Sequence, residues 1–287
     1  MILVTGATGH LGSAIVQQLK KHLSHKEFIV TSSNETGLKQ LEEQGLQARL
    51  ADFSNPETLK LAFQGITQIA LVSTMDSNRL EQHKNVIDAA KGEGVKHIVY
   101  TSLAIKDINS SGVYDLMVSH FQTEDYLKES GVGYTILRNT MYADALTQIL
   151  GQEGLKKNIN LPGGDGKVPY VLRREMGEAT ANLLLKDKKE NKIYNITNSQ
   201  SYSYQDIANE LTDITGNKIE YKDISNEKFV EGLKQIGFPE FAIYLHAGTV
   251  LDIKNHQYEI VEHTLEDLLG RPPSSAREFL KEIFELN

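Results

Sequence analysis

A glycine-rich stretch near the start of the chain constrains the fold more than any other feature. The sequence TGATGHLG, residues 5–12, places glycines at positions 6, 9 and 12 directly after the apolar run 2–4. A helical pattern follows, with Leu11, Ile15 and Leu19 on one face. Glycines at this spacing between a strand and a helix are typical of a site where a nucleotide pyrophosphate binds the helix N-terminus.

Each glycine has its own expected role in such a site. Gly6 permits the tight turn, Gly9 lets the backbone approach the phosphates, and Gly12 allows close packing of helix and strand. The free N–H groups and the positive dipole end of the helix then attract the anion. The alternative is a turn that needs only a flexible backbone. We expect the following residues to bind the cofactor: Gly6, Thr8, Gly9, His10, Leu11 and Gly12.

The first 140 residues alternate between short apolar runs and helical patterns. The runs are rich in branched side chains, which predicts buried strands. They lie near residues 2–4, 27–30, 48–50, 69–72, 97–100 and 134–137. Alternation of this kind predicts a parallel sheet with helices on both faces and right-handed crossovers. We therefore expect an α/β protein with a doubly wound Rossmann domain that binds NAD(P) over residues 1–150.

The pattern changes after residue 150. A glycine-rich turn at 160–166 is followed by a helical stretch at 173–185 and by a strand-like segment at 192–197. Most of the remaining chain has a helical pattern. We expect residues 151–287 to form a smaller, mostly helical region that binds the substrate, and the segment at 192–197 is a candidate to return to the Rossmann sheet.

The composition argues against several classes of protein. The chain has 30 basic and 38 acidic residues, and the net charge of -8 argues against a nucleic-acid partner. It has no cysteine, so disulfides and thiolate sites are excluded. The nine histidines show no spacing typical of metal ligands, so no metal site is expected. No signal peptide or membrane-spanning segment is recognised, which predicts a cytoplasmic protein without a membrane partner.

The end of the second predicted strand bears on the choice between NAD and NADP. It carries Ser32 and Ser33, and no acidic residue occurs there before Glu35. A carboxylate at this place binds the ribose hydroxyls of NAD and would repel a 2′-phosphate. Its absence permits NADP(H), which we favour, with NAD(H) as the alternative. The two serines either bond the ribose or only start a turn.

The ends of the third and fourth strands supply further candidates for cofactor binding. Asp52 is placed to accept a bond from the adenine amino group, and Phe53 to flank the adenine ring. Alternatively, Asp52 caps the next turn. Ser73 and Thr74 follow the fourth strand, where small polar side chains let the cofactor pass.

The catalytic pair of ordinary short-chain dehydrogenases is missing. Those enzymes use a tyrosine and a lysine four residues later, because the lysine lowers the pKa of the phenol. Here Tyr114, Tyr126, Tyr134 and Tyr142 are followed at that spacing by Val118, Ser130, Arg138 and Leu146. Ordinary alcohol oxidation is therefore not expected.

Three other residues are candidates for contact with the nicotinamide or the acceptor. They are Asn139 and Tyr142, at the end of the sixth strand, and His120, in the helix before it. The alternative for His120 is a histidine with satisfied hydrogen bonds, partly buried and without a role in the reaction. We expect Glu124 and Arg138 to be structural rather than catalytic.

Several stretches resemble the NmrA-like branch of the atypical short-chain dehydrogenases. They are ILVTGATGHLG, ADFSNPETL, HKNVIDAAKGEGVKHIVYTSL, HFQTEDYLKESGVGYTILRNTMY, PGGDGK and KIYNITNSQSYSYQDIANELTDITG. The glycine stretch is shared by the whole superfamily. More specific are the patterns HxxTE, at residues 120–124, and LRNxxY, at residues 137–142. Within the branch the chain is most similar to the type 2 NAD(P)H:quinone oxidoreductases, with the triphenylmethane reductases as near relatives.

This resemblance implies a fold and a function. It implies a Rossmann domain with a smaller C-terminal substrate region, NADPH as cofactor, and hydride transfer to a quinone-type acceptor without a Tyr-Lys pair. Relatives that use NADPH often have an arginine where this chain has Ser32 and Ser33. Two alternatives stay open: a non-catalytic NAD(P)-binding redox sensor of the NmrA type, and a reductase of azo or triphenylmethane dyes. The partner expected is a small molecule, and a homodimer is an open alternative.

Overall fold

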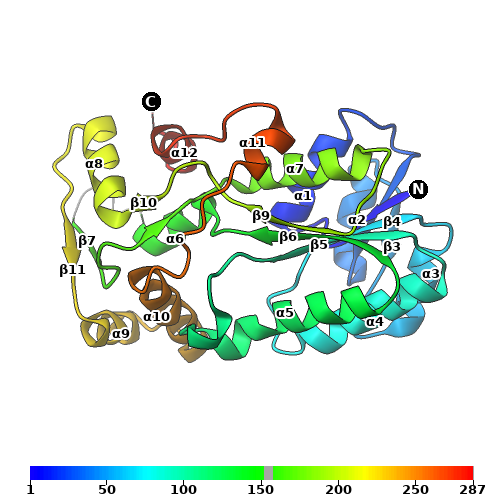
Figure 1. The fold of residues 1–287 in the computed structure, drawn as a ribbon, viewed down its shortest axis with the longest axis horizontal. Coiled ribbons are helices and arrows are strands. Elements are labelled where there is room, and N and C mark those ends of the chain that lie inside the picture. The colour runs from blue at the N-terminus through cyan, green and yellow to red at the C-terminus, as the bar shows by residue number, and fades with distance from the viewer. Residues whose placement is uncertain (152–157, 287) are drawn as a thin grey trace. The chain divides into compact units, whose positions relative to one another are not determined.

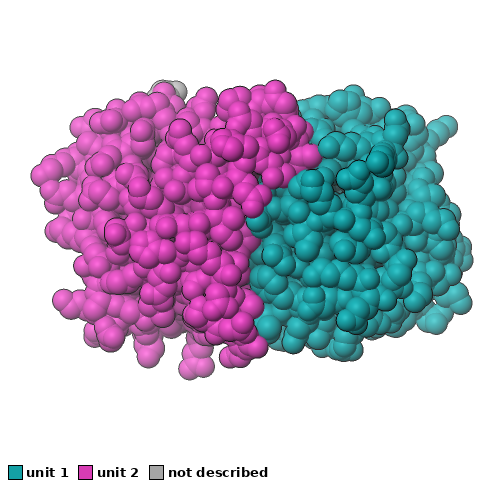
Figure 2. Space-filling view, in the orientation of Figure 1, with its two compact units in different colours: residues 1–103, 118–139, 173–196 teal, residues 104–117, 140–172, 197–287 magenta. Residues whose placement is uncertain are grey.

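The computed structural model describes residues 1–151 and 158–286, which form two compact units (Figure 2). Unit 1 contains residues 1–103, 118–139 and 173–196, and unit 2 contains the segments 104–117, 140–172 and 197–287. Segments of the two units therefore alternate along the chain. The domain boundary expected near residue 150 stays a prediction.

Unit 1 is built on a seven-stranded parallel sheet in the order β3-β2-β1-β4-β5-β6-β9 (Figure 1). The strands are β1 (Ile2–Val4), β2 (Phe28–Ser32), β3 (Ala48–Leu50), β4 (Gln68–Leu71), β5 (His97–Leu103), β6 (Gly133–Asn139) and β9 (Lys192–Ile196). The direction of winding reverses between β1 and β4, and ligands of such sheets bind at the carboxyl ends of the strands near this reversal. The α/β Rossmann prediction is confirmed, and β9 is the returning strand.

Helices cover both faces of this sheet. They are α1 (His10–Leu19), α2 (Glu35–Glu43), α3 (Pro56–Phe63), α4 (Arg79–Gly92), α5 (Tyr114–Glu129) and α7 (Arg173–Leu185). Figure 1 shows α1 and α7 on one face and α4 and α5 on the other. A side chain at Gly177 would overlap Ala14, so two small residues let α7 and α1 approach closely.

The core of unit 1 explains why the strands could be recognised. Buried residues such as Leu3, Ile69, Ile98 and Ile136 pack against Leu59 of α3 and its neighbours on α4 and α5. Strands buried on both faces read as continuous apolar runs rather than as alternating ones. Burying each large aliphatic side chain stabilises the fold by about 1.5–3 kcal/mol.

Unit 2 is mostly helical, with short paired strands. The strands are β7 (Ile159–Leu161), β8 (Lys167–Val168), β10 (Tyr202–Ser203) and β11 (Tyr221–Asp223). β8 pairs with β10 antiparallel, and β7 pairs with β11 parallel. The helices of unit 2 are η1 (Ile108–Ser110), η2 (Ala143–Ala145), α6 (Leu146–Leu150), α8 (Tyr204–Thr215), α9 (Asn226–Gln235), α10 (Glu240–Lys254), α11 (Thr264–Leu269) and α12 (Ala276–Ile283). Throughout the described part of the chain, every helix is too short or too polar to cross a membrane.

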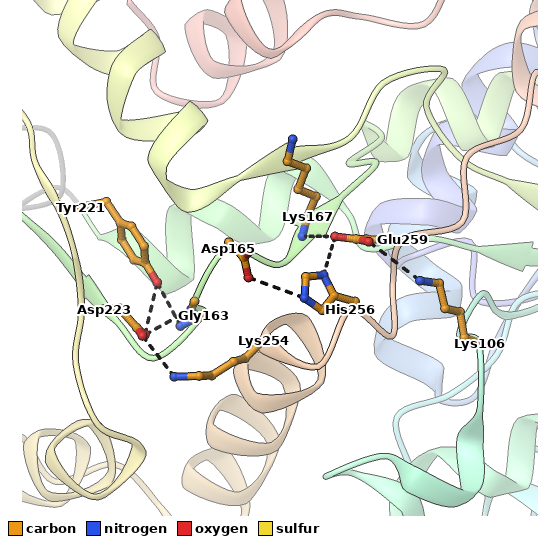
Figure 3. Close-up of polar contacts among 10 residues, drawn as sticks. Lys106, Gly163, Asp165, Lys167, Tyr221, Asp223, Lys254, His256 and Glu259 are labelled. Carbon is orange, nitrogen blue, oxygen red and sulfur yellow. Dashed lines mark hydrogen bonds and ion pairs between the residues drawn. The ribbon is translucent and has the colours of Figure 1, made fainter.

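The glycine-rich turn PGGDGK, residues 162–167, is held from two sides within unit 2 (Figure 3). On one side the Tyr221 hydroxyl, from β11, accepts a bond from the Gly163 amide at 3.1 Å. On the other side Glu259 accepts a bond from the Lys167 amide at 2.9 Å. Further contacts on the two sides involve Gly164, Asp165, Asp223, Lys254 and His256. We assign this turn a structural role, because its backbone amides are bonded to side chains from other parts of unit 2.

Candidate functional site

The turn between β1 and α1 has the tight geometry that its glycines predict. Gly6 adopts a φ of 60°, in the left-handed region that favours glycine. The Gly9 amide donates to the Gly6 carbonyl at 2.9 Å. A side chain at Gly12 would overlap that same carbonyl oxygen. The close approach at Gly12 is thus to the turn itself, which places the start of α1 directly against the loop.

The N-terminus of α1 is suited to an anion. The helix begins at His10. Its N-cap residue is Gly9, so no side chain caps the helix, and its first turn has no acidic residue. The first N–H groups of a helix have no acceptor within the helix. Thr8, Gly9 and His10 are exposed, whereas Leu11 faces the core. These features fit a bound pyrophosphate, because exposed residues lie at the positive dipole end of the helix, where N–H groups have no acceptor within the helix.

The two serines at the end of β2 have different environments. The Ser32 hydroxyl donates to the Asn34 carbonyl at 3.0 Å, and the Asn34 side chain accepts from the Gly37 amide at 2.9 Å, capping α2. Ser32 and Asn34 therefore form a local turn. Ser33 is exposed, so its side chain is accessible to a ribose phosphate at this strand end.

The residues after β3 have local partners. The Asp52 carboxylate accepts a bond from the Ser54 amide at 2.9 Å, which is the turn-capping alternative. The Phe53 ring is buried and lies edge-on to His83, with 6.2 Å between the ring centres. Their roles at the adenine stay predictions.

Ser73 and Thr74 lie at the carboxyl end of β4, as the sequence predicts. The Ser73 amide donates to the Thr101 hydroxyl of β5 at 2.9 Å, and the Thr74 hydroxyl donates to Gln82 of α4 at 3.0 Å. Both residues are half-buried. These bonds fix the loop after β4, and contact with the cofactor stays a prediction for this pair.

Asn139 has the most informative environment among the candidate residues. It is the last residue of β6, opposite Leu103 of β5, and only 3% of its surface is exposed. Within residues 1–151 and 158–286, both polar atoms of its amide lack a hydrogen-bond partner. Leaving a buried polar group without a partner costs about 1–3 kcal/mol, so such a group requires an explanation. An amide at a strand end that offers one donor group and one acceptor is suited to pair with a ligand.

His120 is buried in a polar cluster of unit 1. Its Nδ1 atom lies 2.9 Å from the Tyr100 hydroxyl. Burial and the nearby Arg79 charge hold the pKa of His120 well below its usual value, and burial raises the pKa of Tyr100. Neither group therefore supplies an acid near neutral pH. This environment agrees with the alternative of a histidine with satisfied hydrogen bonds, and a catalytic role stays a prediction.

Arg79 is part of the same cluster and was not recognised from the sequence. Its side chain is fully buried, with Nε donating to the Thr74 carbonyl at 2.6 Å and Nη1 donating to Ser119 at 2.8 Å. Its charge also lowers the pKa of His83, which burial alone already lowers. An arginine at the start of a helix is usually exposed, so the sequence has no signal for this burial.

Tyr142 belongs to unit 2. Its backbone forms a bridge with Val171, and its side chain is half-buried. Its role at the acceptor, and the substrate role of the C-terminal region, stay predictions.

Comparisons with known proteins agree with this fold. The model of the NmrA-like family matches residues 1–267. The chain is 30% identical to quinone oxidoreductase 2 of Escherichia coli (strain K12), over 100% of both proteins. It is 25% identical to the NAD(P)H azoreductase of Xenophilus azovorans, covering 98% of this chain and 97% of that protein.

Solved structures give the same relationship. The NADPH-dependent quinone oxidoreductase of Escherichia coli in complex with NADPH superposes with a TM-score of 0.91 at 30% identity, covering 99% of this chain and 100% of that one. The Citrobacter triphenylmethane reductase in complex with NADP(H) has the same TM-score, identity and coverage. The chain belongs to the NmrA-like family.

Proposed function

We propose that this chain is a reductase that transfers hydride from NAD(P)H to a quinone. The observation that carries the proposal is the Asn139 amide, buried without a partner at the carboxyl end of β6. Full-length relatives support it: an NADPH-dependent quinone oxidoreductase and a triphenylmethane reductase in complex with NADP(H). The chain is accordingly an oxidoreductase with NADP(H) as its favoured cofactor, and NAD(H) is the alternative.

The residues present fit this cofactor. The uncapped start of α1 would hold the pyrophosphate, and the exposed Ser33 would lie beside the ribose phosphate. The Asn139 amide would bind either the nicotinamide carboxamide or a carbonyl oxygen of the acceptor. When bound, the cofactor supplies the hydride, and the protein's part is to position the two reactants and exclude side reactions.

A quinone suits a site without a dedicated acid. It accepts hydride readily, and positioning alone can supply several kcal/mol of the lowered barrier. The proton that completes the quinol then comes from water. His120 and Tyr100 do not supply it near neutral pH, because burial disfavours the charged form of each.

Dye reduction is the second candidate. Full-length relatives include an azoreductase and a triphenylmethane reductase, and these dyes are also strong electrophiles. A panel of benzoquinone, naphthoquinone, an azo dye and a triphenylmethane dye, followed by loss of NADPH absorbance, separates the two. A kcat/KM for a quinone above that for either dye supports the proposal. Turnover of dyes alone contradicts it.

Replacing Asn139 by alanine is expected to lower kcat/KM for the quinone by about tenfold to a hundredfold, because a positioning contact worth about 1.4–2.8 kcal/mol is lost. NADPH affinity should change far less, since the phosphates bind at α1. Steady-state kinetics and nucleotide titration check both. The matched control is Asn191→Ala, an amide that bonds the Tyr134 backbone at the opposite end of the strand. Equal activity of Asn139→Ala and the wild type would exclude Asn139 from the site.

Replacing Ser33 by aspartate is expected to raise the KM for NADPH by about tenfold and to leave that for NADH unchanged or lower. A carboxylate at the exposed strand end repels the 2′-phosphate, and about 1.4 kcal/mol of repulsion suffices for this factor. Ser33→Asn has nearly the same size without the charge and serves as the control. If aspartate and asparagine variants keep the same preference, Ser33 does not face the ribose.

A further inference from the structure

The buried carboxylate of Glu124 joins the ends of two strands. Glu124 lies on α5, and its side chain has no exposed surface. It accepts a bond from the Ser102 hydroxyl of β5 at 2.6 Å. It also accepts two bonds from Arg138 of β6, from Nε at 2.9 Å and from Nη2 at 2.7 Å. We call these three residues the strand clamp.

The clamp lies one residue before the ends of both strands. Ser102 and Arg138 are opposite each other in the sheet register, and so are Leu103 and Asn139, the residues that follow them. Successive side chains of a strand point to opposite faces. Asn139 therefore points away from the face on which Glu124 holds Arg138. The clamp acts on Asn139 through the strand backbone.

The position of the Asn139 side chain is fixed only through its backbone, unlike the side chains of Ser102 and Arg138. Its amide has no hydrogen-bond partner among the described residues, so no side-chain bond fixes its place before a ligand binds. By contrast, Ser102 and Arg138 are held by Glu124. A displacement of about 1 Å at a reacting site can reduce the rate by about a hundredfold. Contacts that fix the position of the end of β6 therefore also fix the position of the Asn139 side-chain amide.

The ion pair joins a fully buried carboxylate, Glu124, to a partly exposed guanidinium, Arg138, and is not required for stability as such. Apolar residues of similar volume often stabilise a fold equally well, because burying a charge is unfavourable. The Glu124–Arg138 pair instead fixes an orientation, because two parallel bonds hold the carboxylate in one position relative to the planar guanidinium. Two further contacts support the ion pair. Lys128 lies 3.7 Å from Glu124, and the Arg138 guanidinium lies 5.2 Å from the centre of the Phe121 ring.

We propose that Glu124 is a positioning residue, which fixes the ends of β5 and β6 through Ser102 and Arg138 and thereby places the Asn139 amide for hydride transfer. The role in hydride transfer rests on the proposed function. Glu124 ends the HxxTE pattern and Arg138 belongs to the LRNxxY pattern, so the two patterns meet in space through this clamp.

The central test is Glu124→Gln in the full-length protein. Glutamine keeps the size but replaces one carboxylate oxygen with a donor that faces the Arg138 donors. We expect kcat for a quinone to fall by about tenfold or more, while the quinone KM and the NADPH dissociation constant stay within about twofold. The double variant Glu124→Gln, Arg138→Gln restores donor–acceptor pairing without charge and should recover part of kcat. Ser102→Ala removes one bond and should give a smaller loss, which keeps the test available if the glutamine variant does not fold.

A second readout does not depend on turnover. The side-chain amide resonance of Asn139 in NMR spectra, identified by its loss in Asn139→Ala, reports the position of the amide with NADP+ bound. We expect it to shift or broaden in Glu124→Gln and in Ser102→Ala. The control is Glu129→Gln, the same exchange at the last residue of α5, whose side chain is exposed. Glu129→Gln should leave the resonance and kcat unchanged.

The outcomes separate this inference from the proposed function. A wild type that binds NADPH but reduces no acceptor contradicts the proposed function, and the Asn139 resonance still decides whether the clamp positions the amide. An active wild type whose Glu124→Gln variant keeps kcat and the resonance overturns the inference. Loss of kcat together with nucleotide affinity and thermal stability also overturns it, because that is the result of general damage to the fold.

Discussion

Replacing Gly12 by alanine is expected to abolish tight nucleotide binding while the chain stays folded. The added methyl group would overlap the Gly6 carbonyl and approach the Ala7 amide, all backbone atoms of the turn. Backbone cannot move aside as a flexible side chain can, so the turn must open and its N–H groups lose their arrangement around the pyrophosphate. We expect the NADPH dissociation constant to rise by about a hundredfold, which corresponds to about 2.8 kcal/mol.

The measurement is a fluorescence titration with NADPH, together with thermal unfolding. The matched control is Gly92→Ala at the end of α4, where an added methyl group meets no atom within 4 Å. That variant should bind NADPH as the wild type does and gain up to about 1 kcal/mol of stability, because alanine is the better helix former. A Gly12→Ala protein with wild-type affinity would show that the turn does not hold the pyrophosphate.

The free energy of unfolding is expected to fall steeply as the pH drops below about 6.5. Burial and the Arg79 charge lower the pKa of His83 to about 3. Burial and the Lys189 charge lower the pKa of His97 to about 4, and burial holds the pKa of His120 well below its usual value. These histidines stay neutral in the folded protein but take up protons in the unfolded chain.

The sign of the effect follows from proton binding. Between the lowered folded pKa values and the unfolded value of 6.5, the unfolded chain binds more protons, so stability rises with pH and levels off above 6.5. Each histidine contributes up to 1.36 kcal/mol per pH unit, so the three together cost at most about 6 kcal/mol at pH 5. This is comparable to the whole stability of a typical domain, about 5–15 kcal/mol.

Urea unfolding at a series of pH values measures this slope. His83→Leu should reduce the slope below about pH 6 by nearly one proton, because one titrating group is removed. The matched control, Ile87→Val on the same helix, should lower stability by about 1 kcal/mol at every pH and leave the slope unchanged. An unchanged slope in His83→Leu would mean that this histidine is already protonated in the folded state.

The sequence predicted the sheet of unit 1 because its strands are buried on both faces and so appear as continuous apolar runs. It also predicted the nucleotide turn, since strand, glycine spacing and helix are all local features. The strand clamp could not be found in this way. Glu124 is 22 residues from Ser102 and 14 from Arg138. The sheet register places Ser102 opposite Arg138, and only the packing of α5 brings Glu124 to both. Charged residues on a helix are usually exposed, so nothing in the pattern indicated burial.

The division of the chain into two interleaved units could not be predicted from the sequence for a similar reason. The segment after β5 belongs to unit 2, where the Gly112 amide donates to the buried Asp252 carboxylate of α10 at 2.7 Å. A side chain at Gly112 would contact the backbone at Gly248, so these two glycines allow the close approach. The bonded residues are 140 positions apart, and periodicity contains no information about contacts at that separation.

Hydride transfer from NADPH to a quinone can be measured directly. We would mix the protein anaerobically in a stopped-flow instrument with a naphthoquinone and NADPH, either unlabelled or deuterated at the hydride position of the nicotinamide, and repeat the experiment with NADH. We expect rapid oxidation of NADPH, one quinol formed per NADPH consumed, and a slower rate with the deuterated cofactor. Tight binding of NADPH without oxidation by any quinone would contradict it and would favour a protein that senses the nucleotide without using its hydride.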